Sequence, residues 1–226
     1  MYHSKMLFGR AAEVLRNEGL RSLWFRILGE TVYRRAILIE RLLQEPIVEQ
    51  QPGVDVEVNL LTASDLDEYL AHRPGSNAAD ICERFRQGQK CFVARHQGIT
   101  ASTCWAATGA ARIDYLSCEI RLAEDEVYTY GSYTAPRFRT LNIAAVRGNE
   151  MVRYFRERGY RRFVAILMPE NKAAFRPIEK IGYRRIGIIG YVKFGPWRRF
   201  FGRVQPPARP VRFVKPRANG PSTRRP

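Results

Sequence analysis

The sequence predicts an α/β protein built on a mixed sheet with helices on its faces. Three observations lead to this prediction. Strand-like and helix-like runs alternate from residue 54 to about residue 195, as in α/β domains. Before residue 50, apolar residues follow a helical period, which indicates a helical extension. After residue 196, proline and arginine dominate and no periodicity remains, which indicates a tail without regular structure.

Residues 1–50 are expected to form an amphipathic helical extension, with helix from residue 5 to about residue 45. Two interpretations fit its apolar stripe. The extension packs on the main domain or on a second copy of the chain, as in a homodimer, or it lies on an anionic lipid surface. The stripe consists of Leu20, Leu23, Trp24, Ile27 and Leu28.

Residues 54–195 are expected to form the main domain. Its strands are indicated by alternating or continuous apolar runs, and its helices by N-terminal capping residues followed by an apolar period. The predicted strands are residues 54–58, 91–95, 99–107, 112–121, 126–134, 162–167 and 185–194, and the predicted helices are residues 62–72, 77–87, 141–158 and 170–181.

The charge of the chain is concentrated at its C-terminal end. The 226 residues include 38 Lys and Arg against 22 Asp and Glu, a net charge of +16. The last acidic residue is Glu179, and 13 basic residues follow it, so the preceding part carries only +3 (25 basic minus 22 acidic). Residues 196–226 are therefore predicted to be a basic tail rich in proline and arginine, which is disordered over residues 205–226. Such a tail suits an anionic membrane, a nucleic acid or an acidic carrier protein.

The composition also excludes several classes of protein. With 45% hydrophobic and 12% aromatic residues, the chain is not globally disordered. It has no run of about 18 apolar residues, and charges near its start leave no room for a secretory signal. The four cysteines form no CxxC pair, so reduced thiols are expected rather than a metal site. These features predict a cytoplasmic protein, with peripheral membrane contact as an addition.

The strand predicted at residues 126–134 continues through a polar turn directly into the long helix at residues 141–158. Free backbone N–H groups and the helix dipole at such a turn favour an anion, as in a pyrophosphate site. The turn needs a residue that tolerates positive φ, and Asn142 is the best suited. The alternative is an ordinary helix cap by Thr140 or Asn142.

About thirty residues later, after the next predicted strand, comes Asn171 and then the run Glu179-Lys180-Ile181-Gly182-Tyr183. The order strand, R-x-x-N-x-A turn, helix, strand, N-x-x-A-x-x-x-x-E-K-x-G-Y resembles the GNAT (Gcn5-related N-acetyltransferase) superfamily. The resemblance covers about residues 54–194 and is strongest over residues 126–191. Two linked motifs at this separation are more specific than either motif alone.

The resemblance implies a GNAT-like acyl-CoA N-acyltransferase fold, with acetyl-CoA as co-substrate and no metal. In the family, a splay between the strand before the turn and the next strand admits the thioester. The implied cofactor-binding residues are the strand end Ser132, Tyr133 and Thr134, the turn Arg139, Thr140, Leu141, Asn142, Ile143 and Ala144, and the pantetheine contact Asn171.

The catalytic groups are less well defined, because the chain departs from the family pattern. Asn142 stands where glycine is usual, and Ile178 stands where many members have a tyrosine that protonates the thiolate. Tyr183 is one substitute for that acid. A family glutamate on the donor strand corresponds to Tyr128, and Glu126, on the same face of the strand, is the favoured base. The alternative is that Glu126 belongs to a solvated turn.

The expected function is transfer of an acetyl or other short acyl group from acyl-CoA to a primary amine by direct attack in a ternary complex. The acceptor is a small-molecule or peptide amine. One alternative is an acyltransferase that uses acyl carrier protein as donor. Another is an inactive GNAT-fold module that binds nucleic acid or anionic membrane through its tail.

Overall fold

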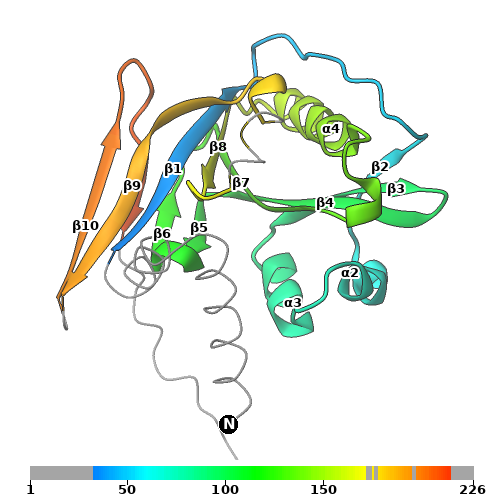
Figure 1. Cartoon of the computed structure of the whole chain (residues 1–226), viewed down its shortest axis with the longest axis horizontal. Helices are drawn as coiled ribbons and strands as arrows, with labels where there is room; N and C mark the ends of the chain where they lie inside the picture. The colour runs from blue at the N-terminus through cyan, green and yellow to red at the C-terminus, as the bar shows by residue number, and fades with distance from the viewer. Residues whose placement is uncertain (1–32, 172–174, 176–177, 195–196, 215–226) are drawn as a thin grey trace, which may run out of the picture.

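The computed structural model describes residues 33–171, 175, 178–194 and 197–214. An eight-stranded sheet in the order β10-β9-β1-β8-β7-β4-β3-β2 forms the body, and a three-stranded sheet in the order β11-β6-β5 accompanies it. Helix α4 covers one face of the large sheet, whereas α2 and α3 lie on the opposite side (Figure 1). The prediction of a mixed α/β sheet is confirmed.

The strands and helices have the following bounds. In chain order they are β1 (Tyr33–Leu42), β2 (Glu57–Leu60), η1 (Ala63–Asp65), α2 (Leu66–His72), α3 (Ala78–Arg86), β3 (Lys90–His96), β4 (Ile99–Thr108), β5 (Ala110–Ile113), η2 (Asp114–Leu116), β6 (Cys118–Arg121), β7 (Glu126–Thr134), η3 (Pro136–Phe138), α4 (Ile143–Glu157), β8 (Arg162–Leu167), β9 (Arg184–Phe194), β10 (Trp197–Val204) and β11 (Arg212–Val214).

Most of the predicted elements between residues 62 and 194 are present, and β7 and β8 have the predicted bounds. Local chemistry accounts for the helix starts. Thr62 and Asp65 form a capping box before α2, and the side chain of Asn77 accepts a hydrogen bond from the Ala79 N–H at the start of α3. Several other bounds differ from the prediction by one or two residues, and two strands differ more. The strand predicted at 54–58 is β2, and the strand predicted at 112–121 is split into β5 and β6 by a turn.

The predicted helix up to about residue 45 is wrong for Tyr33–Leu42, which forms β1. This strand lies between β8 and β9 and is antiparallel to both. The run Ile37-Leu38-Ile39 suits a strand covered on both faces, and the helical period seen at residues 20–28 does not continue into it. The predicted helix at residues 5–32 lies outside the described residues.

The prediction of a tail without regular structure from residue 196 is also wrong for the part that the structure describes. β10 pairs with β9 over its whole length, and β11 pairs with β6. Alternate side chains of β10, Phe200 and Val204, pack against the core, so the period of two was present among the arginines. The prolines of this region, Pro206, Pro207 and Pro210, lie between the two strands. Residues 215–226 lie outside the described residues.

Apolar core clusters lie on both faces of the large sheet. On one face, Leu38, Val164 and Tyr191 pack with residues of β5 and β6. On the other face, Phe163 packs with Phe155 and other residues of α4. Three of the cysteines are buried free thiols, and burial raises the pKa of the Cys91 thiol to about 12. Among the described residues, no helix is long and apolar enough to cross a membrane.

Candidate functional site

A wedge opens between the parallel strands β7 and β8. They pair only at Glu126–Arg162, Val127–Phe163 and Tyr128–Val164. Beyond these pairs β7 follows β4, while β8 continues along β1. From Thr129 onward, therefore, one edge of β7 faces the wedge instead of a described strand. The splay that the resemblance implied is present.

A bulge bends β7 beside this wedge. Its register with β4 shifts between Thr103 and Trp105, so that two residues, Gly131 and Ser132, oppose one residue of β4. Gly131 has φ +61°, and its carbonyl accepts a hydrogen bond from the Arg73 guanidinium. A residue with a Cβ would be strained at this φ and would press on the Trp105 ring, 3.4 Å away.

The turn between β7 and α4 contains two non-glycine residues with positive φ. Thr140 has φ +69° and Asn142 has φ +56°, and α4 begins directly afterwards at Ile143. The positive φ predicted for Asn142 is confirmed. Its side chain does not cap α4. Instead, its Nδ2 donates to the Gln51 carbonyl at 3.1 Å, which ties the turn to the segment before β2.

The backbone N–H groups of residues 140–144 have no protein acceptor among the described residues. The next two, of Ala145 and Val146, donate to the Asn142 carbonyl at 3.0 and 3.1 Å. Free N–H groups at the positive end of a helix dipole form an anion site. The turn therefore has the donors that a phosphate or pyrophosphate requires.

The hydroxyl of Tyr183 lies at the opening of the wedge. It is 3.2 Å from the Thr129 hydroxyl, on the first residue of β7 beyond the paired stretch. Desolvation raises the pKa of Tyr183 above its ordinary value, so the hydroxyl is protonated at neutral pH. The candidate acid Tyr183 therefore has a protonated hydroxyl beside the splay.

Arg147 is a buried residue of this region that the sequence analysis did not identify. Its guanidinium donates to the Thr103 carbonyl at 2.7 Å, to the Ser132 hydroxyl at 2.9 Å and to the Ser102 hydroxyl. It thereby ties α4 to the bulged part of β7. The signal was present, because Arg147 is four residues from both Ile143 and Met151 on the apolar face of the helix.

The other predicted cofactor residues gather at the same edge of the sheet. The Thr134 hydroxyl lies 2.8 Å from the Ser102 hydroxyl, and the Tyr133 ring meets the His72 ring edge-on at 5.1 Å. Asn171 is exposed in the turn after β8. Because β7 and β8 are parallel, the segments that follow them leave the sheet at the same edge.

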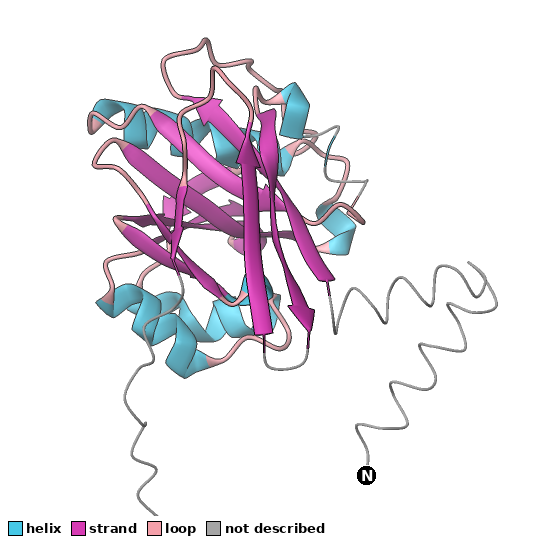
Figure 2. Ribbon diagram, turned by 90° about the vertical axis from the view of Figure 1, so that its left-hand side faces the viewer, coloured by secondary structure: helices cyan, strands magenta, loops and turns pink. Residues whose placement is uncertain are grey.

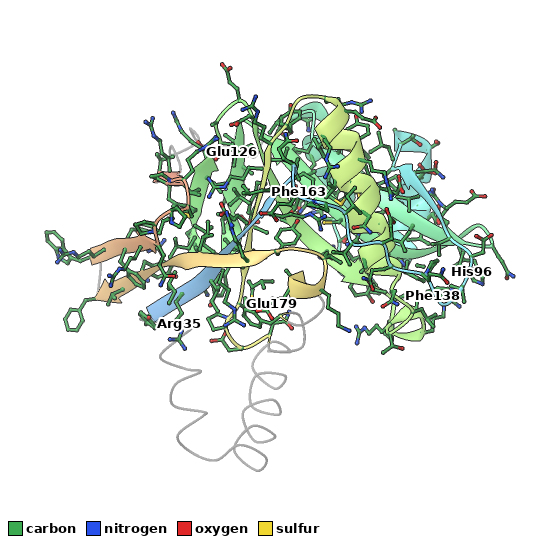
Figure 3. The ribbon with its side chains drawn as sticks, turned by 90° about the horizontal axis from the view of Figure 1, so that it is seen from above. Arg35, His96, Glu126, Phe138, Phe163 and Glu179 are labelled. Carbon is green, nitrogen blue, oxygen red and sulfur yellow. The ribbon has the colours of Figure 1, made fainter. Side chains whose placement is uncertain are left out.

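The two predicted base positions lie elsewhere. Glu126 starts β7, so it is about 26 Å from Thr134 along the strand, and Figure 3 shows it well apart from Phe138 of the turn. It is buried and pairs with Arg162 at 2.7 Å. Tyr128 is 3% exposed and stacks on Tyr130, and burial raises its pKa. Glu126 is therefore neither a solvated turn residue nor a free base beside the splay.

A cavity of about 600 Å³ adjoins the end of β7. It lies between α2, the β3–β4 turn and the segment after β7, and residues that line it include His72, Thr100, Tyr133, Pro136 and Arg137. Burial lowers the pKa of His72, which is therefore neutral at pH 7. The cavity is large enough for a small molecule.

No family model and no curated protein matches this chain. Solved structures of GNAT acetyltransferases are similar to it. A protein of Novosphingobium aromaticivorans assigned to the GNAT family has a TM-score of 0.48 and 18% identity, over 70% of this chain and 63% of its own. An aminoglycoside N-acetyltransferase in complex with CoA has a TM-score of 0.48 and 16% identity, over 68% of this chain and 98% of its own.

A GNAT-family acetyltransferase of Colwellia psychrerythraea has a TM-score of 0.48 and 12% identity, over 73% of this chain and 59% of its own. This chain thus spans less than two thirds of the Novosphingobium and Colwellia proteins. At these identities the likeness concerns the fold.

Proposed function

We propose that this protein is a GNAT-type N-acyltransferase that moves an acetyl or other short acyl group from acyl-CoA to a primary amine. One observation carries the proposal: the turn that follows the splayed end of β7 has N–H groups at residues 140–144 with no acceptor in the described part of the chain. An anion cradle next to an unpaired strand edge suits a ligand that has a pyrophosphate at one end and an amide-containing arm at the other.

In this proposal the turn holds the CoA pyrophosphate, and the main chain of Ser132, Tyr133 and Thr134 pairs with the pantetheine arm. Asn171, in the turn after β8, is the expected side-chain contact to that arm. The thioester then lies near the bulge at Gly131, where main-chain N–H groups stabilise the developing oxyanion.

The unprotonated amine attacks the thioester carbonyl carbon and forms the new C–N bond. The tetrahedral intermediate then collapses with cleavage of the C–S bond. The nitrogen gives up a proton, and the departing thiolate takes one up. Tyr183 is the proposed donor of that second proton, since its hydroxyl lies beside the splay and is protonated at neutral pH.

The cradle is tested by replacing Ala144, the second residue of α4. Ala144→Glu places a carboxylate in the first turn, where the helix dipole tolerates it, but where it repels a pyrophosphate. We expect the Kd of acetyl-CoA, measured by calorimetry, to rise about tenfold or more. Ala144→Gln is the neutral control of the same size, and it should raise the Kd of acetyl-CoA less than Ala144→Glu does. Equal affinities for both variants, or no affinity of the wild type for CoA, would contradict the proposal.

The role of Tyr183 is tested by Tyr183→Phe. We expect kcat to fall about 100-fold with the Kd of acetyl-CoA unchanged, because the phenyl ring keeps the packing and loses only the proton. The readout is release of the CoA thiol in the presence of a panel of primary amines. Because the pKa is raised, the wild-type donor should remain protonated beyond about pH 10. Tyr160→Phe is the control in the same core, and a similar loss there would exclude a specific role for Tyr183.

The acceptor is proposed only as a class, a small-molecule or peptide amine, and the cavity beside Tyr133 is its candidate site. The runner-up is an acyltransferase that takes its acyl group from acyl carrier protein. Calorimetry with acetyl-CoA distinguishes these two functions, because an enzyme that takes its acyl group from acyl carrier protein requires little affinity for free CoA. The proposed location is the cytoplasm, with peripheral contact to a membrane.

A further inference from the structure

The hairpin β9–β10 has one packed face and one open face. It forms one end of the large sheet, at the front of Figure 2, and extends away from the body of the protein at the left of Figure 1. Ile189, Tyr191 and Phe200 pack into the core on one face. The other face carries four large apolar side chains that are between 37% and 45% exposed, namely Tyr33, Ile188, Val192 and Phe201.

The most exposed apolar side chains of the described residues lie at the tip of this hairpin. Phe194, the last residue of β9, is 83% exposed, and Trp197, the first residue of β10, is 79% exposed. The two residues are partners in the register of the hairpin. Ile37 of β1 pairs with Leu167, the last residue of β8, on one side and with Ile188 of β9 on the other. The tip projects beyond the end of β8, because β9 continues for six residues after Ile188. Six residues of strand extend about 20 Å.

Positive charge surrounds this apolar surface. Neither β9 nor β10 contains an acidic residue. The exposed basic residues of the open face are Arg35 of β1 (Figure 3), Arg199 and Arg203, and the exposed Lys193 lies beside the tip on the other face of β9. Within the part of the chain that the structure describes, none of the four has a carboxylate within salt-bridge distance.

This combination distinguishes a lipid surface from a nucleic acid. Bases stack on aromatic rings, whereas the exposed face also presents the aliphatic side chains Ile188 and Val192, which have no ring for a base to stack on. Two of its aromatic rings, Tyr33 and Phe201, already stack on each other at 5.8 Å. Tryptophan and phenylalanine at a projecting tip, with arginines beside them, match the boundary between lipid headgroups and acyl chains.

We propose that the hairpin β9–β10 docks this protein on an anionic phospholipid surface. Phe194 and Trp197 enter the headgroup region, and Lys193, Arg199 and Arg203 contact lipid phosphates. This inference concerns a surface outside the proposed acyl-CoA site and does not depend on that proposal.

The experiment is co-sedimentation of the full chain with vesicles of phosphatidylcholine alone and of phosphatidylcholine with 30% phosphatidylserine. We expect binding to the anionic vesicles only, with affinity that falls as salt is added. The double variant Phe194→Ser/Trp197→Ser should bind at least about tenfold more weakly. Arg199→Ser/Arg203→Ser should bind roughly 25-fold more weakly, since each basic residue near such a surface contributes about fivefold.

Two matched controls lie elsewhere on the surface. Val48→Ser removes an apolar side chain that is 49% exposed, and Arg86→Ser removes an arginine whose side chain is 72% exposed. Both should bind as the wild type does. Thermal melting shows whether each variant is folded.

Three results would overturn the proposal. The wild type does not bind anionic vesicles, or the tip variant binds them as tightly as the wild type, or a single-stranded oligonucleotide binds the same surface with the same dependence on Phe194 and Trp197. The last result would assign the hairpin to a nucleic acid instead.

Discussion

Arg162→Met is expected to lower the free energy of unfolding by about 3–5 kcal/mol, because it leaves two buried carboxylates without their shared partner. The guanidinium of Arg162 lies 2.6 Å from Glu40 of β1 and 2.7 Å from Glu126 of β7. All three side chains are 3% exposed or less. Without Arg162, the basic partner of Glu40 is Arg184 and that of Glu126 is Arg209, and both arginines are half exposed.

The effect of Arg162→Met is measured by thermal and denaturant unfolding, and a loss of this size corresponds to roughly 10 °C in Tm. Arg112→Met is the matched control, because Arg112 pairs with Asp114 at 2.7 Å on the surface with 69% of its side chain exposed. It should change the free energy of unfolding by less than about 1 kcal/mol. A similar small change for Arg162→Met would mean that the buried cluster does not hold β1 against β7 and β8.

Gly190→Ala is expected to destabilise the protein by about 3 kcal/mol, because β9 has no room for a side chain at this position. A Cβ on Gly190 would lie 2.2 Å from the Arg34 carbonyl of β1 and 2.6 Å from the Phe201 ring of β10. The carbonyl is backbone and cannot rotate away. The strand would have to separate from β1, and the hairpin β9–β10 with it.

Gly202→Ala is the matched control in the same hairpin. The nearest atom to a Cβ there is the Ile189 Cγ2 at 3.5 Å, an ordinary contact. Its free energy of unfolding should therefore stay within about 0.5 kcal/mol of the wild type. Equal losses for Gly190→Ala and Gly202→Ala would contradict the close approach of β1 and β9.

Much of the fold could be predicted from local signals. The capping box before α2, the alternating β-strands and the apolar period of α4 each depend on residues close together in the chain. Asn142 is the clearest case for the site. A turn from strand to helix needs a residue that tolerates positive φ, and Asn142 adopts φ +56° there.

The wrong predictions share one physical cause. β1 and β10 are strands because of partners far away in the sequence, and neither partner is visible in a local pattern. The sheet buries one side of β10 in the core, and it pairs the buried Glu40 of β1 with Arg162.

Glu126 shows the same limit within the candidate site. Its place on the strand before the turn made it a reasonable base from sequence spacing alone. Its chemistry depends on Arg162, which lies 36 positions later in the chain and reaches it only because β7 and β8 are parallel neighbours. Arg147 was not identified from the sequence, although its helical spacing places it on the apolar face of α4. Its partners on β4 and β7 are distant in the chain and could not be read from the sequence.

The sequence by itself thus determined the mixed α/β class, the bounds of β7 and β8, the turn that presents free N–H groups, and the concentration of positive charge after Glu179. These depend on backbone preferences, apolar periods and composition, all of which are local. Only the tertiary structure decided that β1 and β10 belong to the large sheet, that Glu126 is an ion-pair residue and that Tyr183 lies beside the splay. Each of these depends on which distant strands become neighbours, and buried pairing between strands is settled by the whole sheet.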